Sequence, residues 1–109
     1  MSADDLLGGA GDVVMTAQTV DEAPRPQAQT APTYPARARA RGIEGTVTLS
    51  LLIDESGRVS EASVLDAQPP GVFDDAALAA VRQWRFTPAR YEGRSVRVRV
   101  EQPLRFDLR

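Results

Sequence analysis

The sequence predicts an α+β domain in which two helices pack on a three-stranded antiparallel sheet, with room for one extra short strand. Three observations support this prediction. Apolar residues alternate strictly over residues 46–53, and a turn and a second strand-forming segment follow at once. The longest alternation of the chain covers residues 96–108 and closes the sequence. Two segments with the composition of helices, residues 36–41 and 74–85, precede the first and the last of these strands.

The first two strands are predicted to form a β-hairpin over residues 46–65. Apolar residues stand at every second position from Val47 to Ile53, with threonine and serine between most of them. Four turn-forming residues follow at 54–57 and end on a glycine, where a positive φ is usually needed. The apolar positions of the second strand change parity along its length, which predicts a β-bulge near Glu61-Ala62.

Two helices are predicted around this hairpin. The first covers residues 36–41, because Pro35 suits a first helical turn and Gly42 ends the run. The second covers residues 74–85 and begins with two aspartates, which are stabilised at the positive end of the helix dipole. Its apolar face repeats at spacings of three and four and consists of Ala77, Leu78, Val81 and Trp84.

The last strand, residues 96–108, has apolar residues on even positions and mostly charged residues on odd ones. Pro103 lies within it, and a proline inside a strand favours the edge of a sheet. The second helix carries the chain across, so the third strand runs antiparallel beside the first. The predicted spatial order is therefore 2-1-3, with residues 46–53 in the centre.

Residues 1–31 differ in composition from the rest of the chain. They hold three of the eight glycines and two of the eight prolines, and five acidic residues against one arginine. Their apolar run Val13-Val14-Met15 is too short to anchor a packed element alone. We predict that these residues form a flexible leader, most of it disordered; the alternative is a strand that orders only against the domain. The folded domain is predicted to cover residues 32–109.

The composition excludes several kinds of site. The chain has no cysteine and no histidine, which removes the commonest metal ligands and the Ser-His and Cys-His nucleophile arrangements. The acidic pair Asp74-Asp75 is explained by its place at a helix start, where adjacent side chains point apart. The turn at residues 54–57 has too few ligands for a calcium loop. We therefore predict no catalytic residue, no metal, no cofactor and no enzymatic activity.

Charge and hydropathy limit the partners. The formal net charge of -2 argues against a general nucleic-acid binder. All thirteen basic residues are arginines, which fits a coding bias better than a dedicated anion site. No stretch approaches the ~18 apolar residues of a membrane span, and residues 1–5 lack the basic start of a signal peptide. As given, the sequence predicts a soluble chain.

A set of short motifs occurs in order along residues 32–109. The motifs are Tyr34-Pro35-Ala36-Arg37-Ala38, Ile43-Glu44-Gly45-Thr46-Val47, Gly57-Arg58-Val59, Phe73-Asp74, Trp84-Arg85-Phe86-x-Pro88-Ala89 and a closing Val-x-Val…Leu-x-Phe strand. Each motif alone is weakly specific. The ordered set resembles the C-terminal domain of TonB, the energy transducer of Gram-negative bacteria.

The resemblance implies a periplasmic domain of two helices against a sheet of three or four strands. It implies contact with the TonB box of outer-membrane receptors, which adds as a strand along the last strand of the domain. It also implies that the full-length protein is anchored in the inner membrane and coupled to the proton motive force through ExbB and ExbD. The sequence departs from this pattern, since it contains no membrane helix and no long Pro-Lys or Pro-Glu linker. That departure predicts a soluble fragment.

Seven residues are predicted to contact a partner. They are Tyr34 and Arg37 of the first motif, and Arg97, Val98, Arg99, Val100 and Glu101 of the last strand. Residue type alone favours a solvated face for Arg37, whereas the resemblance implies that this arginine faces the receptor plug. Within the last strand, the missing N–H of Pro103 is tolerated where it faces outward. The odd positions then point their N–H groups outward and would pair with an extended receptor segment.

Two functions from different classes remain open at this point. One is the adaptor in energised transport that the resemblance implies. The other is a TonB-like scaffold or sensor module appended to another membrane protein. An exposed edge strand also favours homodimers by edge pairing or swapping.

Overall fold

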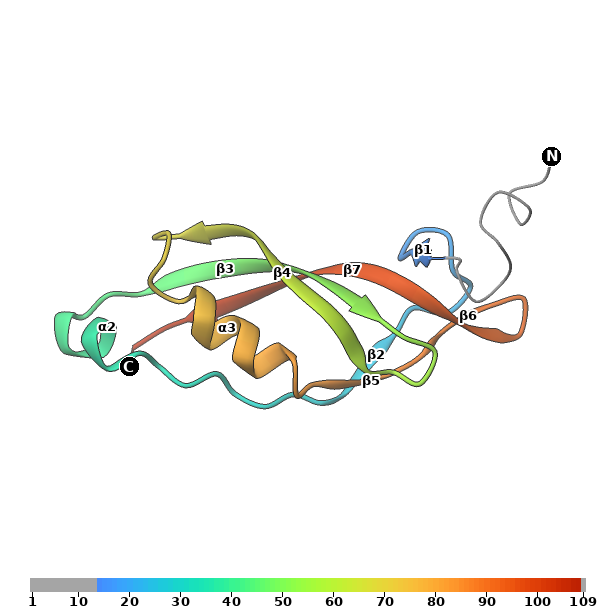
Figure 1. Cartoon of the computed structure of the whole chain (residues 1–109), viewed down its shortest axis with the longest axis horizontal. Helices are drawn as coiled ribbons and strands as arrows, with labels where there is room; N and C mark the ends of the chain where they lie inside the picture. Colours follow the sequence, from blue (N-terminus) through green and yellow to red (C-terminus); the bar gives the residue numbers. More distant parts are fainter. Residues whose placement is uncertain (1–13, 109) are drawn as a thin grey trace.

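The computed structural model describes residues 14–108. In chain order its elements are β1 (Val14–Thr16), β2 (Arg25–Ala28), α2 (Ala36–Arg41), β3 (Gly45–Ile53), β4 (Val59–Gln68), α3 (Asp74–Val81), β5 (Arg85–Thr87), β6 (Ala89–Tyr91) and β7 (Arg94–Phe106). The molecule is elongated, with α2 at one end of its long axis and β1 and β6 at the other (Figure 1). The predicted α+β class is confirmed.

The hairpin of β3 and β4 forms where the alternation predicts it. The alternate residues Val47, Leu49, Leu51 and Ile53 are all fully buried. The bulge predicted near Glu61-Ala62 is present at the neighbouring Ser60, which the pairing with β3 skips, and a second bulge that was not predicted lies at Leu65. The bulge at Ser60 shifts the core-facing positions of β4 from odd to even numbers after Val59. The second bulge shifts them back to odd numbers, so that Ala67 is buried.

The predicted strand order is present within a larger sheet. β7 pairs antiparallel with β3 from Gly45 opposite Phe106 to Ile53 opposite Val98, which gives the order β4-β3-β7. β1 pairs in parallel with the other side of β7, and β6 pairs antiparallel with the first residues of β7. The three-stranded antiparallel sheet was therefore an incomplete prediction. β1 and β6 have three residues each, too few for a periodic pattern.

The two helices begin at the predicted positions. α2 ends at Gly42, which has a φ of 69° and donates its N–H to the Arg39 carbonyl at 3.2 Å. α3 ends at Val81 and not at residue 85. Trp84 thus lies outside the helix, because the chain turns directly into β5, which pairs with β2.

The core lies between α3 and one face of the central sheet. Its largest fully buried side chains are Phe73, Leu49, Leu51, Ile53, Val47, Val81 and Val98. At the end near α2, the ring of Phe73 stacks on Phe106 with centroids 4.4 Å apart, and Tyr34 meets Phe73 edge-on at 5.4 Å. These are favourable geometries for aromatic pairs, so the cluster closes this end of the core.

Residues 14–31 pack along the side of the domain (Figure 1). β2 pairs antiparallel with β5, and beyond β2 the indole N–H of Trp84 donates to the Thr30 carbonyl at 2.8 Å. Residues 14–31 thus differ from the predicted flexible leader, and β1 and β2 match the alternative, strands that order against the domain. Residues 1–13 lie outside the described residues.

Candidate functional site

The predicted binding strand is β7, and its backbone has two different sides. Its pairing with β3 continues on both sides of Pro103, which lies opposite Thr48. Because proline has no N–H, this register requires that the donor position of residue 103 face away from β3. Backbone groups alternate along a strand, so Arg97, Arg99 and Glu101 also direct their N–H groups away from β3. We call this side of the strand the outer edge of β7.

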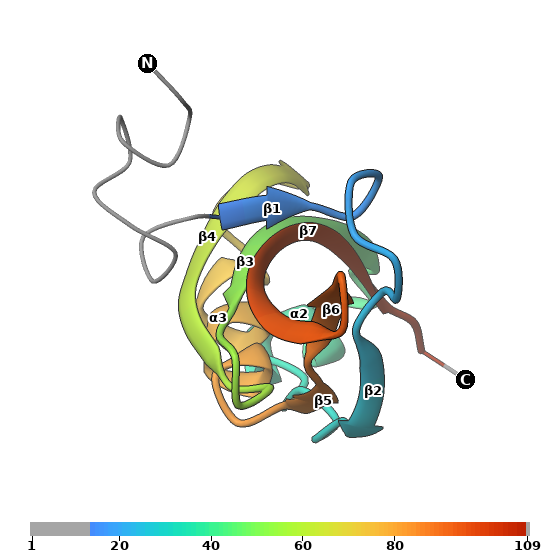
Figure 2. The same ribbon diagram turned by 90° about the vertical axis from the view of Figure 1, so that its right-hand side faces the viewer.

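β1 occupies the outer edge of β7, as the view along the molecule shows (Figure 2). The pairing is parallel, with Val14 opposite Arg97, Met15 opposite Val98 and Thr16 opposite Arg99. The Thr16 N–H donates to Thr19 Oγ1 at 3.0 Å, so alternation directs the N–H of Met15 toward β7. Met15 also packs against the core, in which Val98 is fully buried. An extended segment of the chain itself thus sits where a receptor strand was predicted.

Arg99 reaches from β7 across the face of the sheet opposite α3. Its Nη1 donates to Ser50 Oγ at 3.0 Å, and its Nη2 lies 3.7 Å from Glu61 Oε2. Ser50 is a buried polar residue, so this bond satisfies a group that would be costly to leave unpaired. The guanidinium also borders a hollow of about 550 Å³ that Leu65 and residues 16–18 line. The Arg99 side chain therefore supports the buried Ser50 and is also exposed to solvent beside the outer edge.

The other predicted strand residues differ in accessibility. The side chain of Val98 belongs to the core, and its N–H faces β3, so Val98 offers neither a side chain nor a donor to a partner at the outer edge. Arg97 and Val100 are half-buried, and Glu101 is exposed. The outer edge therefore offers backbone groups and charged side chains at odd positions.

Tyr34 lies at the opposite end of the domain and makes internal contacts. Its hydroxyl donates to the Ile43 carbonyl, and the Arg39 guanidinium lies 5.1 Å from the centre of its ring. Burial, followed by the charge of Glu44, raises the pKa of the Tyr34 hydroxyl, and Arg39 partly opposes this rise. The geometry thus places Tyr34 as a support for α2 and the aromatic cluster.

Arg37 is exposed on α2. Together with Arg41, it lines a hollow of about 440 Å³ whose other wall includes Gly71 and Val72. The structure does not bring Arg37 together with Arg97–Glu101. Phe106 of β7 lies close to Tyr34, with ring centroids 5.9 Å apart, and the strand from Arg97 to Phe106 covers about 30 Å at ~3.3 Å per residue.

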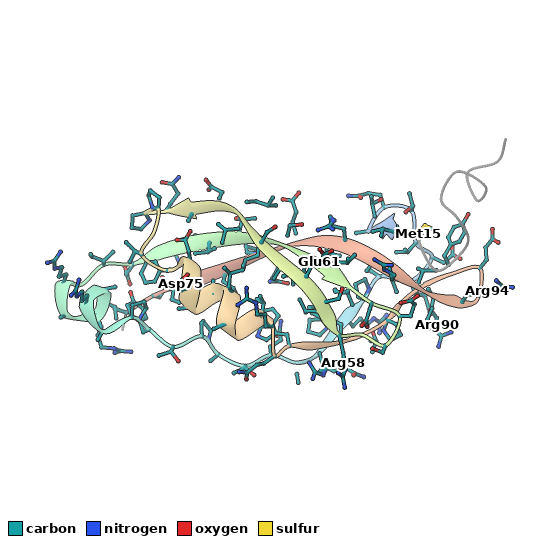
Figure 3. The ribbon with its side chains drawn as sticks, viewed as in Figure 1. Met15, Arg58, Glu61, Asp75, Arg90 and Arg94 are labelled. Atoms are coloured by element: carbon teal, nitrogen blue, oxygen red, sulfur yellow. The ribbon has the colours of Figure 1, made fainter. Side chains whose placement is uncertain are left out.

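A group of contacts that the sequence did not predict attaches Asp21 and Glu22 of the leader to Arg90 of β6 and to Glu92. We call this group the clamp. The backbone N–H groups of Asp21 and Glu22 donate to the Arg90 carbonyl at 2.8 and 3.1 Å. The Arg90 N–H in turn donates to the Glu22 carbonyl at 3.0 Å. The Asp21 carboxylate accepts the Glu92 N–H at 2.6 Å, and the Glu22 carboxylate lies 3.5 Å from Arg90 Nε. Figure 3 shows Arg90 at the same end of the molecule as Met15. The acidic pair Asp21-Glu22 was visible in the sequence, but its partners arise only from the tertiary fold.

Two further features bear on the class of protein. Residues 14–108 contain no group of three or more acidic, histidine or cysteine side chains placed to hold a metal ion. No helix in that part of the chain is long and apolar enough to cross a membrane. A small α+β domain whose last strand accepts an added strand is typical of a protein-interaction module that recognises extended segments.

The chain belongs to the family of Gram-negative bacterial TonB protein C-terminal domains, whose model matches residues 30–108. Protein TonB of Vibrio cholerae is 38% identical over 89 residues, which cover 82% of this chain and 36% of that protein. Protein TonB of Yersinia enterocolitica is 43% identical over 63 residues, or 58% of this chain and 25% of that protein. The chain thus spans about a third or less of the length of these curated relatives.

Solved structures of TonB domains share the fold. The solution NMR structure of the Pseudomonas aeruginosa TonB CTD has a TM-score of 0.66 at 33% identity, covering 78% of this chain and 86% of that chain. The TonB2 protein from Vibrio anguillarum has a TM-score of 0.58 at 33% identity, with 76% and 83% covered. The predicted resemblance to the TonB C-terminal domain is confirmed.

Proposed function

We propose that this chain is the receptor-binding domain of a TonB-type energy transducer. In this role it lies in the periplasm and contacts the TonB box of outer-membrane receptors, which joins the sheet as an added strand on the outer edge of β7. One observation carries the proposal: the outer edge already accepts an extended segment, β1, over Arg97–Arg99. Coupling to ExbB and ExbD, through an inner-membrane anchor outside this chain, is part of the same proposal and rests on family membership.

The direction of β1 supports a specific orientation for the receptor segment. β1 runs parallel to β7, and β7 runs from the β6 end of the molecule toward α2 (Figure 1). A receptor strand with the same direction would place whatever follows it in the receptor at the α2 end. Arg37 is exposed there beside a hollow that Arg41 also lines. The two groups of predicted site residues, although distant, would then meet consecutive parts of one partner.

The register of β1 also indicates which side chains suit the outer edge. Met15, opposite Val98, packs against the core. Val14 is 40% exposed, and Thr16 is exposed as well. An extended segment with an apolar residue opposite Val98 and small or β-branched residues on either side therefore fits this edge.

An NMR titration tests the proposal. The ¹⁵N-labelled chain would be titrated with synthetic peptides that carry the TonB box of outer-membrane receptors, and with scrambled peptides of the same composition as the control. We expect saturable shifts centred on the amides of residues 97–101 with the TonB-box peptides alone. Shifts confined to β4, or equal shifts with the scrambled peptides, would contradict the proposal.

A further inference from the structure

We propose that β1 is a built-in competitor that occupies the receptor-binding edge of β7 and must leave before a receptor segment binds. This inference rests on the proposed function, because it concerns the same edge. It adds that the domain as described is in a self-occupied state. Receptor binding is then an exchange of one parallel strand for another.

The first argument is that β1 and a receptor strand need the same backbone groups. β1 pairs with Arg97, Val98 and Arg99, which are three of the five strand residues predicted to receive the receptor segment. An outward N–H group can serve one added strand at a time. Farther along the outer edge, Pro103 has no donor to offer. A receptor strand therefore cannot use the edge fully while β1 remains in place.

The second argument is that β1 is held weakly enough to be released. Within the described residues it forms three residue pairs with β7, and a strand of this length is far below the usual five or six residues. Val14 is 40% exposed, and Met15 is half-buried. Releasing β1 thus exposes little apolar surface and leaves the pairing of β3 with β4 and β7 unchanged.

The third argument is that the leader keeps β1 close when it is released. The clamp of Asp21 and Glu22 with Arg90 and Glu92 lies outside β1 and does not depend on it. Residues 17–20 connect β1 to the clamp, and they are long enough to let β1 swing away from β7. A tethered strand has a high effective concentration at its own site. Release is therefore reversible. The apparent affinity of a competing segment is its intrinsic affinity multiplied by the fraction of time that β1 is undocked.

A redox lock in the full chain tests the competition directly. The native sequence has no cysteine, so the double variant Thr16→Cys/Arg99→Cys contains one pair, at positions opposite each other in β1 and β7. Its affinity for a synthetic TonB-box peptide is measured by calorimetry in the oxidised and the reduced state. The wild-type chain with and without reductant is the control. We expect the oxidised form to bind at least about tenfold more weakly than the reduced form, because the lock removes the unoccupied state.

A matched pair of proline variants provides the converse test. Met15→Pro removes the N–H that faces β7 together with the side chain that packs against the core, so it should release β1. Val14→Pro is the control, because the alternation directs its N–H away from β7. If β1 is docked about nine-tenths of the time, Met15→Pro should bind the peptide about tenfold more tightly than the wild type. Val14→Pro should bind like the wild type.

The outcomes separate this inference from the proposed function. Equal affinities of the oxidised and reduced double variant, together with unchanged binding by Met15→Pro, would show that β1 does not compete and would leave the receptor-binding proposal intact. If neither the wild type nor Met15→Pro binds any TonB-box peptide, the proposed function fails and this inference fails with it. Weaker binding by Met15→Pro than by the wild type would mean that β1 supports the site, which also overturns the inference.

Discussion

The indole N–H of Trp84 donates a hydrogen bond to the carbonyl oxygen of Thr30 at 2.8 Å. These residues lie far apart in the sequence, and the bond joins the leader to the core of the domain. Trp84 is itself almost fully buried, and its ring lies 6.3 Å from that of Phe86 in β5. The leader is therefore attached to one of the few large side chains of the core.

Trp84→Phe should lower the free energy of unfolding by about 1–3 kcal/mol, because it removes this hydrogen bond and part of the buried ring. Urea denaturation of the full chain measures the effect. The control is the same substitution in a chain of residues 31–109, where Thr30 is absent. The loss should be smaller there, and an equal loss in both chains would show that the bond to the leader contributes nothing.

Gly57→Ala should destabilise the domain severely. Gly57 has a φ of 88°, and a Cβ at this position would lie 1.8 Å from the Phe86 carbonyl oxygen. Gly93→Ala is a matched control, because Gly93 has a φ of 80° but nothing within 4 Å of the added carbon. We expect a loss above about 3 kcal/mol for the first variant and about 1 kcal/mol for the second. Similar melting temperatures for the two variants would contradict the packing of the hairpin turn against β5.

Local patterns explain how much of this fold could be predicted. The alternation from Val47 to Ile53 and the glycine-containing turn after it determine the hairpin, because both signals lie within a few residues. The length of α3 was overestimated because Trp84 keeps helical spacing while the chain already turns into β5. Tertiary pairing with β2 overrides the local pattern at that point.

The candidate site was only half predictable for a related reason. The parity of β7 could be derived from Pro103 and the charged odd positions. Its occupant could not, because β1 has three residues and its pairing partner lies about eighty residues away in the sequence. The clamp between Asp21 and Arg90 has the same origin, since it exists only once β6 is in place.

The turn between β3 and β4 should give the stability a dependence on acidic pH. Burial acts to raise the pKa of the Asp54 carboxyl, but hydrogen bonds from the Ser56 hydroxyl and the backbone N–H groups of Arg58 and Ser56 outweigh it, and the net pKa is lowered. Because the folded pKa is depressed, this stabilisation is present above the ordinary value of about 3.9 and is lost as the pH falls through the folded value.

Asp54→Asn should therefore lower the free energy of unfolding by about 1 kcal/mol at pH 7. Below about pH 4 the difference from the wild type should shrink. Denaturant titrations between pH 3 and pH 7 measure this, with the exposed Glu55→Gln as the control. A difference that stays constant, or grows, as the pH falls would show that the carboxylate is not what stabilises the turn.

Arg37→Ala should leave the melting temperature nearly unchanged, because the side chain is exposed on α2. It should weaken binding to an intact outer-membrane receptor by about three- to tenfold, the range expected for one charged contact. Binding of an isolated TonB-box peptide should not change, since that peptide adds at the other end of β7. The exposed Arg82→Ala, at the residue that follows α3, is the control. Early unfolding of Arg37→Ala with normal binding once folded would make Arg37 a structural residue.

The outer edge of β7 as the binding site is tested most directly by calorimetry of a TonB-box peptide with Arg99→Pro. This variant removes an outward N–H and leaves the inward donors to β3 intact. Val98→Pro, its neighbour, removes an inward donor and a fully buried side chain, so it should unfold the domain. We expect Arg99→Pro to stay folded but to melt below the wild type, because the buried Ser50 loses its partner. Since this variant also frees the edge from β1, its affinity is compared with that of Met15→Pro, and we expect it to bind the peptide at least about tenfold more weakly than Met15→Pro. A folded Arg99→Pro that binds as tightly as Met15→Pro would contradict strand addition on β7.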